Sequence, residues 1–437
     1  MDSIDLLSRI AQPGEGKIVL LILDGVGDVR TDAQPRTALE EARTPNLDAL
    51  ARRSALGRIV PVLPGVTPGS GPGHLALFGY DPASDRADIG RGALEALGVG
   101  IDFGAGDVVA RGNFATLAPD GTVADRRAGR ISTEENRRIT ARLGEALQAA
   151  RQAGELSDLE VSVHSGEGHR FVLLVEGQDL SPGIADTDPQ EVGEPPRPLE
   201  PTDPAARATA ERLAPALEVI GRTLADEERA NGFLLRGFDT LPELPTLKEL
   251  YGLNPGCFAG YPLYRGAARL CGMEVVECGK SFPELVDGVR SRLEDFDFFF
   301  LHVKDPDKAG EDGSLDAKVR SLEEVDRALP ELLELFDLGA AAASRRGEGP
   351  GSGPGAGREG GGRDVLAITG DHSTPVPMRS HSWHPVPLLV RGPHCFVDDQ
   401  TAFDELAATR GHLGTFPSRE LMGLLLANAD RLAKYGA

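Results

Sequence analysis

Four apolar runs along the chain predict strands that are buried on both faces. Valine, isoleucine, leucine and phenylalanine dominate these runs, as in the inner strands of a parallel sheet. The runs are residues 17–23, 296–303, 364–369 and 386–390. Between them, apolar positions recur with helical spacing in residues 44–55, 260–272 and 315–336. Strands that alternate with helices indicate an α/β fold with a mostly parallel, doubly wound sheet.

The pattern changes in the middle of the chain, where predicted strand pairs replace the alternation. The elements there are a hairpin at 107–132 around an Asp-Gly turn, a strand pair at 161–177, a proline-rich acidic loop at 183–204 and a helix near 205–230. We therefore expect a discontinuous α/β domain of residues 1–104 and 241–437, and a smaller α+β domain of residues 105–240 inserted within it. Residues 339–364, rich in glycine and alanine, predict a flexible loop of the larger domain.

The charge of the chain limits its partners. A net charge of −22 over 437 residues opposes binding to nucleic acid or to an anionic membrane surface. A small anionic substrate can still bind where cations are concentrated locally. Nearly all of the 46 basic residues are arginines, whose planar guanidinium suits bidentate binding of phosphate.

The sequence predicts a cytoplasmic protein. No apolar run approaches the roughly 20 residues of a membrane helix, and the first residues lack the basic and apolar regions of a signal peptide. The cysteines form no CxxC pair and have no histidine at zinc-site spacing, so we interpret them as structural thiols. They are Cys257, Cys271, Cys278 and Cys395.

Nucleotide-binding motifs are not complete. Gly279-Lys280-Ser281 would need a glycine at position 274 to form a phosphate-binding P-loop, and that position is Glu274. No GxGxxG segment follows a predicted strand.

Acidic and histidine side chains follow three of the predicted strands. They are Asp24, Asp305, Asp307, Asp371 and His372, with His381 and His384 a few residues further on. The carboxyl ends of parallel strands share one edge of a sheet, where ligands bind. Clustered carboxylates repel each other unless a cation neutralises them, and aspartate with histidine suits zinc or manganese. The pattern therefore favours a dinuclear metal site at this edge.

The segment TPGSGPGHLALFGYD, residues 67–81, places Ser70 between two glycines, ahead of a predicted helix that begins near His74. Ser70 has two interpretations, a helix-capping serine or an exposed nucleophile. A serine hydroxyl attacks phosphorus poorly until a metal ion stabilises its alkoxide, so a nearby metal site favours the second. His74 either reaches the site, one turn after Ser70, or packs within its helix.

These residues carry a family resemblance. The chain resembles the alkaline phosphatase superfamily and, within it, the archaeal type of 2,3-bisphosphoglycerate-independent phosphoglycerate mutases. The matching segments run in order along nearly the whole chain: LILDGVGD, TPNLDALA, PGSGPGHLALFGYDP, GRGALEALGVG, RGNFATL, DRRAGRI, DTDP, GYPLYRG, HVKDPDKAGEDG, ITGDHSTP and HSWHPVPLLV. The resemblance implies an alkaline-phosphatase-like α/β fold with an inserted domain.

The resemblance also implies two divalent metal ions and no requirement for 2,3-bisphosphoglycerate. The first ion would be held by Asp24, Ser70, Asp371 and His372, and the second by Asp307, Glu311 and His381. Superfamily members usually have histidine at the position of Glu311, and glutamate shifts the preference from zinc towards manganese, with magnesium and cobalt as further candidates.

The implied reaction interconverts 3-phosphoglycerate and 2-phosphoglycerate in glycolysis and gluconeogenesis. Ser70 would be the nucleophile that carries a phosphoserine intermediate, and Lys304 would help to neutralise the phosphoryl group. The inserted domain would close over the glycerate as a lid. The candidate substrate-binding residues are Arg126, Arg130, His169, Arg170 and Arg265. Two alternatives keep the same site: a metal-dependent phosphatase or phosphodiesterase, and a phosphotransferase that resembles homoserine kinases.

Overall fold

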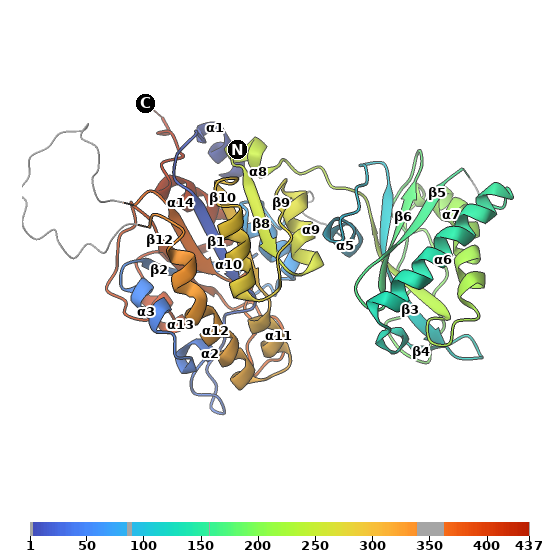
Figure 1. Ribbon diagram of the computed structural model, residues 1–437, viewed down its shortest axis with the longest axis horizontal. Helices are drawn as coiled ribbons and strands as arrows, with labels where there is room; N and C mark the ends of the chain where they lie inside the picture. The colour runs from blue at the N-terminus through green and yellow to red at the C-terminus, as the bar shows by residue number, and fades with distance from the viewer. Residues whose placement is uncertain (1–2, 85–89, 157, 339–361, 437) are drawn as a thin grey trace, which may run out of the picture. The chain divides into compact units, whose positions relative to one another are not determined.

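The computed structural model describes residues 3–84, 90–156, 158–338 and 362–436 (Figure 1). The chain forms two compact units, one of residues Met1–Asp88 with Leu244–Ala437 and the other of residues Ile89–Glu243. The smaller unit thus begins before the expected residue 105, because helix α5 (Arg91–Gly98) buries Ala93 and Ala96 in its hydrophobic core. Of the expected loop at 339–364, all but residues 362–364 lies outside the described residues.

The larger unit contains an eight-stranded sheet of order β13-β2-β12-β11-β1-β10-β8-β9. The strands are β1 (Ile18–Leu23), β2 (Ala55–Val60), β8 (Pro255–Ala259), β9 (Glu274–Val275), β10 (Phe298–Val303), β11 (Val365–Thr369), β12 (Val386–Arg391) and β13 (Gly414–Pro417). All neighbours pair in parallel except that β12 is antiparallel to both β11 and β2. The α/β fold with a mostly parallel sheet is confirmed, as are the four predicted strands, which correspond to β1, β10, β11 and β12.

The position of the central strand β1 determines which residues lie together at the edge of the sheet. All six of its side chains are fully buried, as the continuous apolar run predicts. It lies between β10 and β11, and Ile22 is in register with both His302 and Thr369. The residues that follow these three strands therefore emerge side by side at one edge of the sheet.

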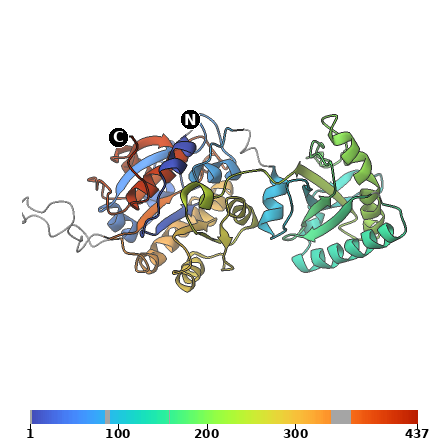
Figure 2. The ribbon, with the colours of Figure 1, turned by 90° about the horizontal axis from the view of Figure 1, so that it is seen from above.

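Helices connect the strands of the larger unit, and α10 and α12 lie in front of the sheet in Figure 1. The helices are α1 (Ser3–Ile10), α2 (Ala38–Glu41), α3 (Pro45–Ala51), α4 (Ser70–Leu77), α8 (Leu247–Tyr251), α9 (Pro262–Leu270), α10 (Phe282–Ser291), α11 (Asp305–Glu311), α12 (Leu315–Leu333), α13 (Glu405–Arg410) and α14 (Leu421–Asn428). Near the two ends of the chain, Ala11 and Leu432 form a β-bridge, so α1 and the C-terminal segment lie together (Figure 2).

The TPNLDALA segment forms α3, which is shorter than the predicted helix at 44–55 because β2 begins at Ala55. The buried carboxylate of Asp326, on α12, accepts hydrogen bonds from the backbone N–H groups of Asn46 and Leu47. This carboxylate satisfies donors that the first turn of a helix leaves without partners. The segment is therefore explained by packing between two helices.

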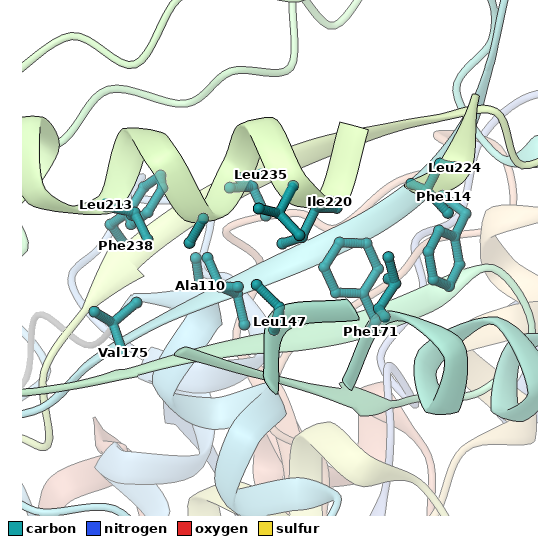
Figure 3. Close-up of a cluster of buried hydrophobic side chains, with 14 of the residues drawn as sticks. Ala110, Phe114, Leu147, Phe171, Val175, Leu213, Ile220, Leu224, Leu235 and Phe238 are labelled. Carbon is teal, nitrogen blue, oxygen red and sulfur yellow. The ribbon is translucent and has the colours of Figure 1, made fainter. Parts of the chain in front are cut away.

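The smaller unit is an antiparallel sheet with helices packed against it. Its elements are β3 (Val108–Leu117), β4 (Val123–Asp125), β5 (Glu160–Ser165), β6 (Arg170–Glu176) and β7 (Gly232–Asp239), with helices α5, α6 (Thr133–Gln152) and α7 (Ala206–Leu224). Strand β3 pairs with β4, β6 and β7, and β5 pairs with β6. Figure 3 shows Leu213 of α7 beside Phe238 of β7, and Ile220 and Leu224 of α7 towards the end of the core where Phe114 and Phe171 of the sheet lie.

In the described part of the chain, none of the helices has the length and hydropathy that a membrane crossing requires.

Candidate metal centre

Side chains from the ends of β1, β10 and β11 meet at one edge of the larger sheet. Asp24 directly follows β1, Asp307 lies in the first turn of α11 after β10, and Asp371 and His372 follow β11. Each of these four side chains is at most 1% exposed. The parallel topology thus brings together residues that are up to 348 positions apart in the sequence, as Asp24 and His372 are.

Asp24, Asp371 and His372 form one grouping of possible metal ligands, whose ligand atoms all lie within 4.8 Å of one another. The Nε2 atom of His372 is 3.4 Å from Oδ1 of Asp24 and 3.2 Å from Oδ2 of Asp371. Both carboxylate oxygens are buried and have no hydrogen-bond partner. Buried oxygens without donors are costly, and a cation between them would remove that cost.

Asp307, His372 and His381 form a second grouping that shares His372 with the first. Nε2 of His381 is 3.6 Å from Oδ1 of Asp307, and the rings of His381 and His372 stack with centroids 3.6 Å apart. Glu311 lies beside this grouping, with Oε1 3.7 Å from Nε2 of His381. Its side chain is 53% exposed, and partial burial followed by the charge of Asp307 raises its pKa.

The charge of the cluster fits a divalent cation. Three buried carboxylates lie close together, and Lys304 Nζ donates to Oδ2 of Asp24 at 2.9 Å and to Oδ2 of Asp307 at 2.6 Å. Burial lowers the pKa of Lys304, but the charges of Asp24 and Asp307 outweigh it and raise the pKa above its ordinary value. Burial and the charge of Asp24 raise the pKa of Asp371 well above its ordinary value. The excess negative charge and the oxygen and imidazole donors both suit a metal ion.

Ser70 is the first residue of α4, and the cap position belongs to Gly69. The hydroxyl Oγ lies 3.5 Å from Nε2 of His372, at the margin of a hydrogen bond, and makes no capping bond. A Cβ atom at Gly73 would lie 2.6 Å from the carbonyl oxygen of Asp371, so glycine is needed for α4 to approach this ligand. The capping interpretation of Ser70 is therefore wrong, and its hydroxyl faces the first grouping.

The carboxylates are supported by three side chains that no sequence motif marked as site residues, Tyr264, His302 and Thr374. The Tyr264 hydroxyl donates to Oδ2 of Asp24 at 2.5 Å, and its ring stacks on His302 at 3.6 Å. The Thr374 hydroxyl donates to Oδ1 of Asp307. A polar His302 inside the apolar run FFFLHV is the one signal that could have pointed to this support.

His74 lies one turn after Ser70 in α4. It is packed within the protein, as one interpretation expected, and it also reaches a ligand of the site, as the other did. Its Nδ1 atom is 2.8 Å from the Ser70 carbonyl oxygen and 3.3 Å from Oδ2 of Asp371. Burial, together with the charge of His302, lowers the pKa of His74 to about 3. A neutral imidazole at this position orients the first turn of α4.

Three residues named from the sequence lie outside the cluster. Asp305 is exposed, and the ring of His384 contacts the Ser382 hydroxyl at 3.0 Å. Arg265, on α9, forms an ion pair with Glu277.

The smaller unit gathers positive charge around His169. Burial and four neighbouring guanidinium groups lower the pKa of His169 to about 4. In order of influence, these groups belong to Arg170, Arg127, Arg111 and Arg130. Arg111 was missed because a single arginine in a strand resembles an ordinary surface residue. We call these five residues the cationic cluster.

Arg126 does not belong to this cluster. Its Nε and Nη2 atoms donate to the two carboxylate oxygens of Asp188 at 2.9 and 2.6 Å. Asp188 is fully buried; burial is the largest influence on its pKa and raises it, but the bond from Arg126, the Gln190 N–H and the charges of Arg126 and Arg236 together lower the pKa below its ordinary value. The fork of Arg126 is therefore engaged within the protein.

Two family models match the chain. One, described as 2,3-bisphosphoglycerate-independent phosphoglycerate mutase, matches residues 51–230, which include Ser70 and the cationic cluster. The other describes the metalloenzyme superfamily and matches residues 361–428, which include Asp371, His372 and His381. Binding of divalent metal is a property of these families, and the two ligand groupings agree with it.

Curated relatives and solved structures match along the full length. A probable 2,3-bisphosphoglycerate-independent phosphoglycerate mutase of Thermus thermophilus is 46% identical over 440 residues, and one of Thermotoga neapolitana is 44% identical over 438 residues, each with complete coverage of both chains. A solved protein of Pyrococcus horikoshii has a TM-score of 0.76 and 27% identity, over 98% of this chain and 100% of its own. The cofactor-independent phosphoglycerate mutase of Thermoplasma acidophilum has a TM-score of 0.67 and 29% identity, over 95% of this chain and 100% of its own. The chain belongs to the family of 2,3-bisphosphoglycerate-independent phosphoglycerate mutases.

Proposed function

We propose that the protein interconverts 3-phosphoglycerate and 2-phosphoglycerate without a bisphosphoglycerate cofactor, and that Ser70 carries the phosphoryl group between the two positions. The observation that supports this most strongly is the place of the Ser70 hydroxyl, 3.5 Å from the histidine common to both ligand groupings. The 46% identity with a probable phosphoglycerate mutase over the full chain supports phosphoglycerate as the substrate.

The reaction divides into two transfers of opposite direction. In the first, Ser70 Oγ bonds to phosphorus as the bond from phosphorus to the glycerate oxygen breaks, and the hydroxyl proton is balanced by protonation of the freed glycerate oxygen. In the second, the other glycerate hydroxyl takes the phosphoryl group from Ser70 and returns a proton to Oγ. Glycerate must stay bound between these steps, because its loss would let water take the phosphoryl group.

We propose two divalent ions for this site. Asp24, Ser70, Asp371 and His372 would hold the first, and Asp307, Glu311 and His381 the second. When bound, the ions neutralise the phosphoryl oxygens and favour ionisation of the serine hydroxyl. We favour manganese, with magnesium, cobalt and zinc as alternatives, because four of the seven residues offer carboxylate oxygen.

The chain's own cations would orient the substrate. Lys304, whose N–H groups donate to Asp24, Asp307 and the Tyr264 hydroxyl, would place its positive charge beside the phosphoryl group. Arg130, His169 and Arg170 would bind the glycerate carboxylate, since guanidinium groups bind carboxylates in a fixed geometry. Arg126 and Arg265, which we also expected to contact substrate, are paired with Asp188 and Glu277, and we propose that they hold their own segments in place.

We further propose that the protein works in glycolysis and gluconeogenesis in the cytoplasm. Its four cysteines are free thiols, which agrees with a reducing compartment.

The test is an assay of the purified chain with 3-phosphoglycerate and Mn²⁺ in the absence of 2,3-bisphosphoglycerate. We expect 2-phosphoglycerate to form, to stop forming when a chelator removes the metal, and to form again when Mn²⁺ is returned. Release of inorganic phosphate with no 2-phosphoglycerate would identify a phosphatase instead. Transfer from ATP to homoserine, again without 2-phosphoglycerate, would identify a kinase.

A further inference from the structure

Lys318, on α12, is a fully buried lysine that takes no part in the proposed reaction. Its Nζ atom donates to the carbonyl oxygens of Gly25 at 2.8 Å, Thr374 at 2.9 Å and Gly27 at 3.1 Å. An ammonium group has three N–H donors, so these three carbonyls use all of them. A buried charge is costly unless it is fully bonded, and an arrangement this complete indicates a specific task.

The three carbonyls belong to two loops that carry metal ligands. Gly25 and Gly27 follow Asp24 at the end of β1, and Thr374 follows His372 after β11. The Thr374 N–H also lies 3.2 Å from the Gly25 oxygen and 3.1 Å from the Gly27 oxygen. The loops are thus joined by backbone contacts, and Lys318 bonds to both of them from the α12 side.

Glycine is required on one side of this junction. Gly25 has φ of +61°, and a Cβ atom there would lie 2.5 Å from the Thr374 hydroxyl. A Cβ atom at Gly27 would lie 2.0 Å from the Ser373 hydroxyl. Because no side chain separates the loops, three carbonyl dipoles converge in a buried space. Without the ammonium they would repel each other and the loops would move apart.

The junction is connected directly to the ligands of the second grouping. The Thr374 hydroxyl donates to Oδ1 of Asp307 and lies 3.1 Å from Nδ1 of His372. A shift of Thr374 would therefore move the hydrogen bond that orients Asp307 and the ring that both groupings share. Lys318 is joined to both groupings through one residue.

Acidic groups on other elements compensate the Lys318 charge. Asp28 and Glu405 act on it electrostatically, and the Asp28 N–H donates to Oε1 of Glu405 at 3.0 Å. Thr37 donates to the other oxygen of Glu405 at 2.6 Å. The lysine therefore contacts the ligand loops through its hydrogen bonds and is also stabilised by these acids, with smaller effects from Asp307 and Asp24.

We propose that Lys318 is a positioning residue for the metal centre, whose ammonium sets the separation of the Asp24 loop from the Asp371–His372 loop and thereby the affinity for metal. This inference rests on the proposed function, of which metal binding is a part. The role is distinct from general stabilisation because it predicts a change in metal affinity in addition to any change in folding.

The experiment compares Lys318→Met with Arg431→Met in the full chain. Arg431 is a matched control: it is 3% exposed, and its Nε atom donates to the Gly16 oxygen at 3.1 Å, before the start of β1 rather than after its end. Both substitutions remove a buried cation that bonds to backbone beside β1. The measurements are the affinity of the metal-stripped protein for Mn²⁺ by calorimetry and its unfolding in urea.

We expect both variants to unfold at lower urea, but only Lys318→Met to bind Mn²⁺ more weakly, by roughly 10–100-fold, the usual range for a lost partner of a metal ligand. Equal Mn²⁺ affinity in the two variants would overturn the inference. If Lys318→Met does not fold, Lys318→Gln, which keeps an N–H donor, decides the question by the same affinity comparison. A wild-type chain that binds none of Mn²⁺, Mg²⁺, Co²⁺ and Zn²⁺ would instead overturn the proposed function.

Discussion

The metal centre of the larger unit and the cationic cluster of the smaller unit differ in the sign of their charge and in how deeply their side chains are buried. The three aspartates of the metal centre are buried, follow three parallel strands, and are held by hydrogen bonds from Tyr264, Lys304 and Thr374. The cationic cluster is half-buried or exposed, with Arg127 and Arg130 at the surface. Buried groups depend on one another's positions, whereas exposed cations act almost independently. A single substitution in the metal centre should therefore abolish metal binding and turnover, whereas one in the cationic cluster should raise the KM by a moderate factor.

The largest effect is expected from Asp371→Asn. This change removes a charge from a buried oxygen that has no other partner, so Mn²⁺ affinity should fall by more than about 100-fold, beyond the range for outer partners of a ligand. Turnover should fall below detection. Calorimetry with Mn²⁺ measures the metal affinity, and formation of 2-phosphoglycerate measures the turnover. Asp305→Asn is the control, because Asp305 is an exposed acid after β10 and should change neither. Unchanged Mn²⁺ binding in Asp371→Asn would remove this residue from the centre.

A graded effect is expected from Arg170→Ala and Arg130→Ala in the cationic cluster. Each should raise the KM for 3-phosphoglycerate by about tenfold, the value of one charged hydrogen bond, with Mn²⁺ affinity unchanged. Steady-state kinetics at saturating Mn²⁺ measures this. An unchanged KM in both variants would place the glycerate carboxylate elsewhere.

Arg126→Ala provides the contrast within the same unit. It leaves the buried Asp188 carboxylate without its bidentate partner, so the free energy of unfolding should fall by about 2–4 kcal/mol, towards the lower end because Arg126 is partly exposed. Urea unfolding measures this change. A raised KM for 3-phosphoglycerate with an unchanged free energy of unfolding would show instead that Arg126 binds substrate.

The sequence predicted the sheet and the edge at which the acids meet, because apolar runs and the residues that follow them are local signals. It did not reveal Tyr264, Thr374 or Lys318 as supports, since each contacts residues far away in the chain and nothing nearby marks it. The same holds for α5, whose burial in the smaller unit depends on packing against β3 and β7. Arg126 and Arg130 lie in one motif and have the same chemistry, and only the fold places Asp188 against one of them.

The smallest effect is a pH dependence of stability that comes from His169. Its pKa is lowered from 6.5 to about 4 by burial and the surrounding arginines, so between these values the unfolded chain takes up a proton that the folded chain does not. The contribution of His169 to stability is thus present above pH 6.5 and is lost as the pH falls towards 4. Urea unfolding across this range should be less steeply pH-dependent in His169→Gln. Parallel curves for variant and wild type would contradict the lowered pKa.

The central claim is that Ser70 carries the phosphoryl group, and the most direct measurement is mass spectrometry of the enzyme quenched in acid during turnover. With Mn²⁺ and 3-phosphoglycerate, the peptide that contains Ser70 should carry the mass of one phosphoryl group, and fragmentation should place it on Ser70. Ser70→Ala should show neither the modification nor 2-phosphoglycerate formation, while its urea unfolding stays close to that of wild type. A phosphoryl group on another residue, or mutase activity in Ser70→Ala, would contradict the account.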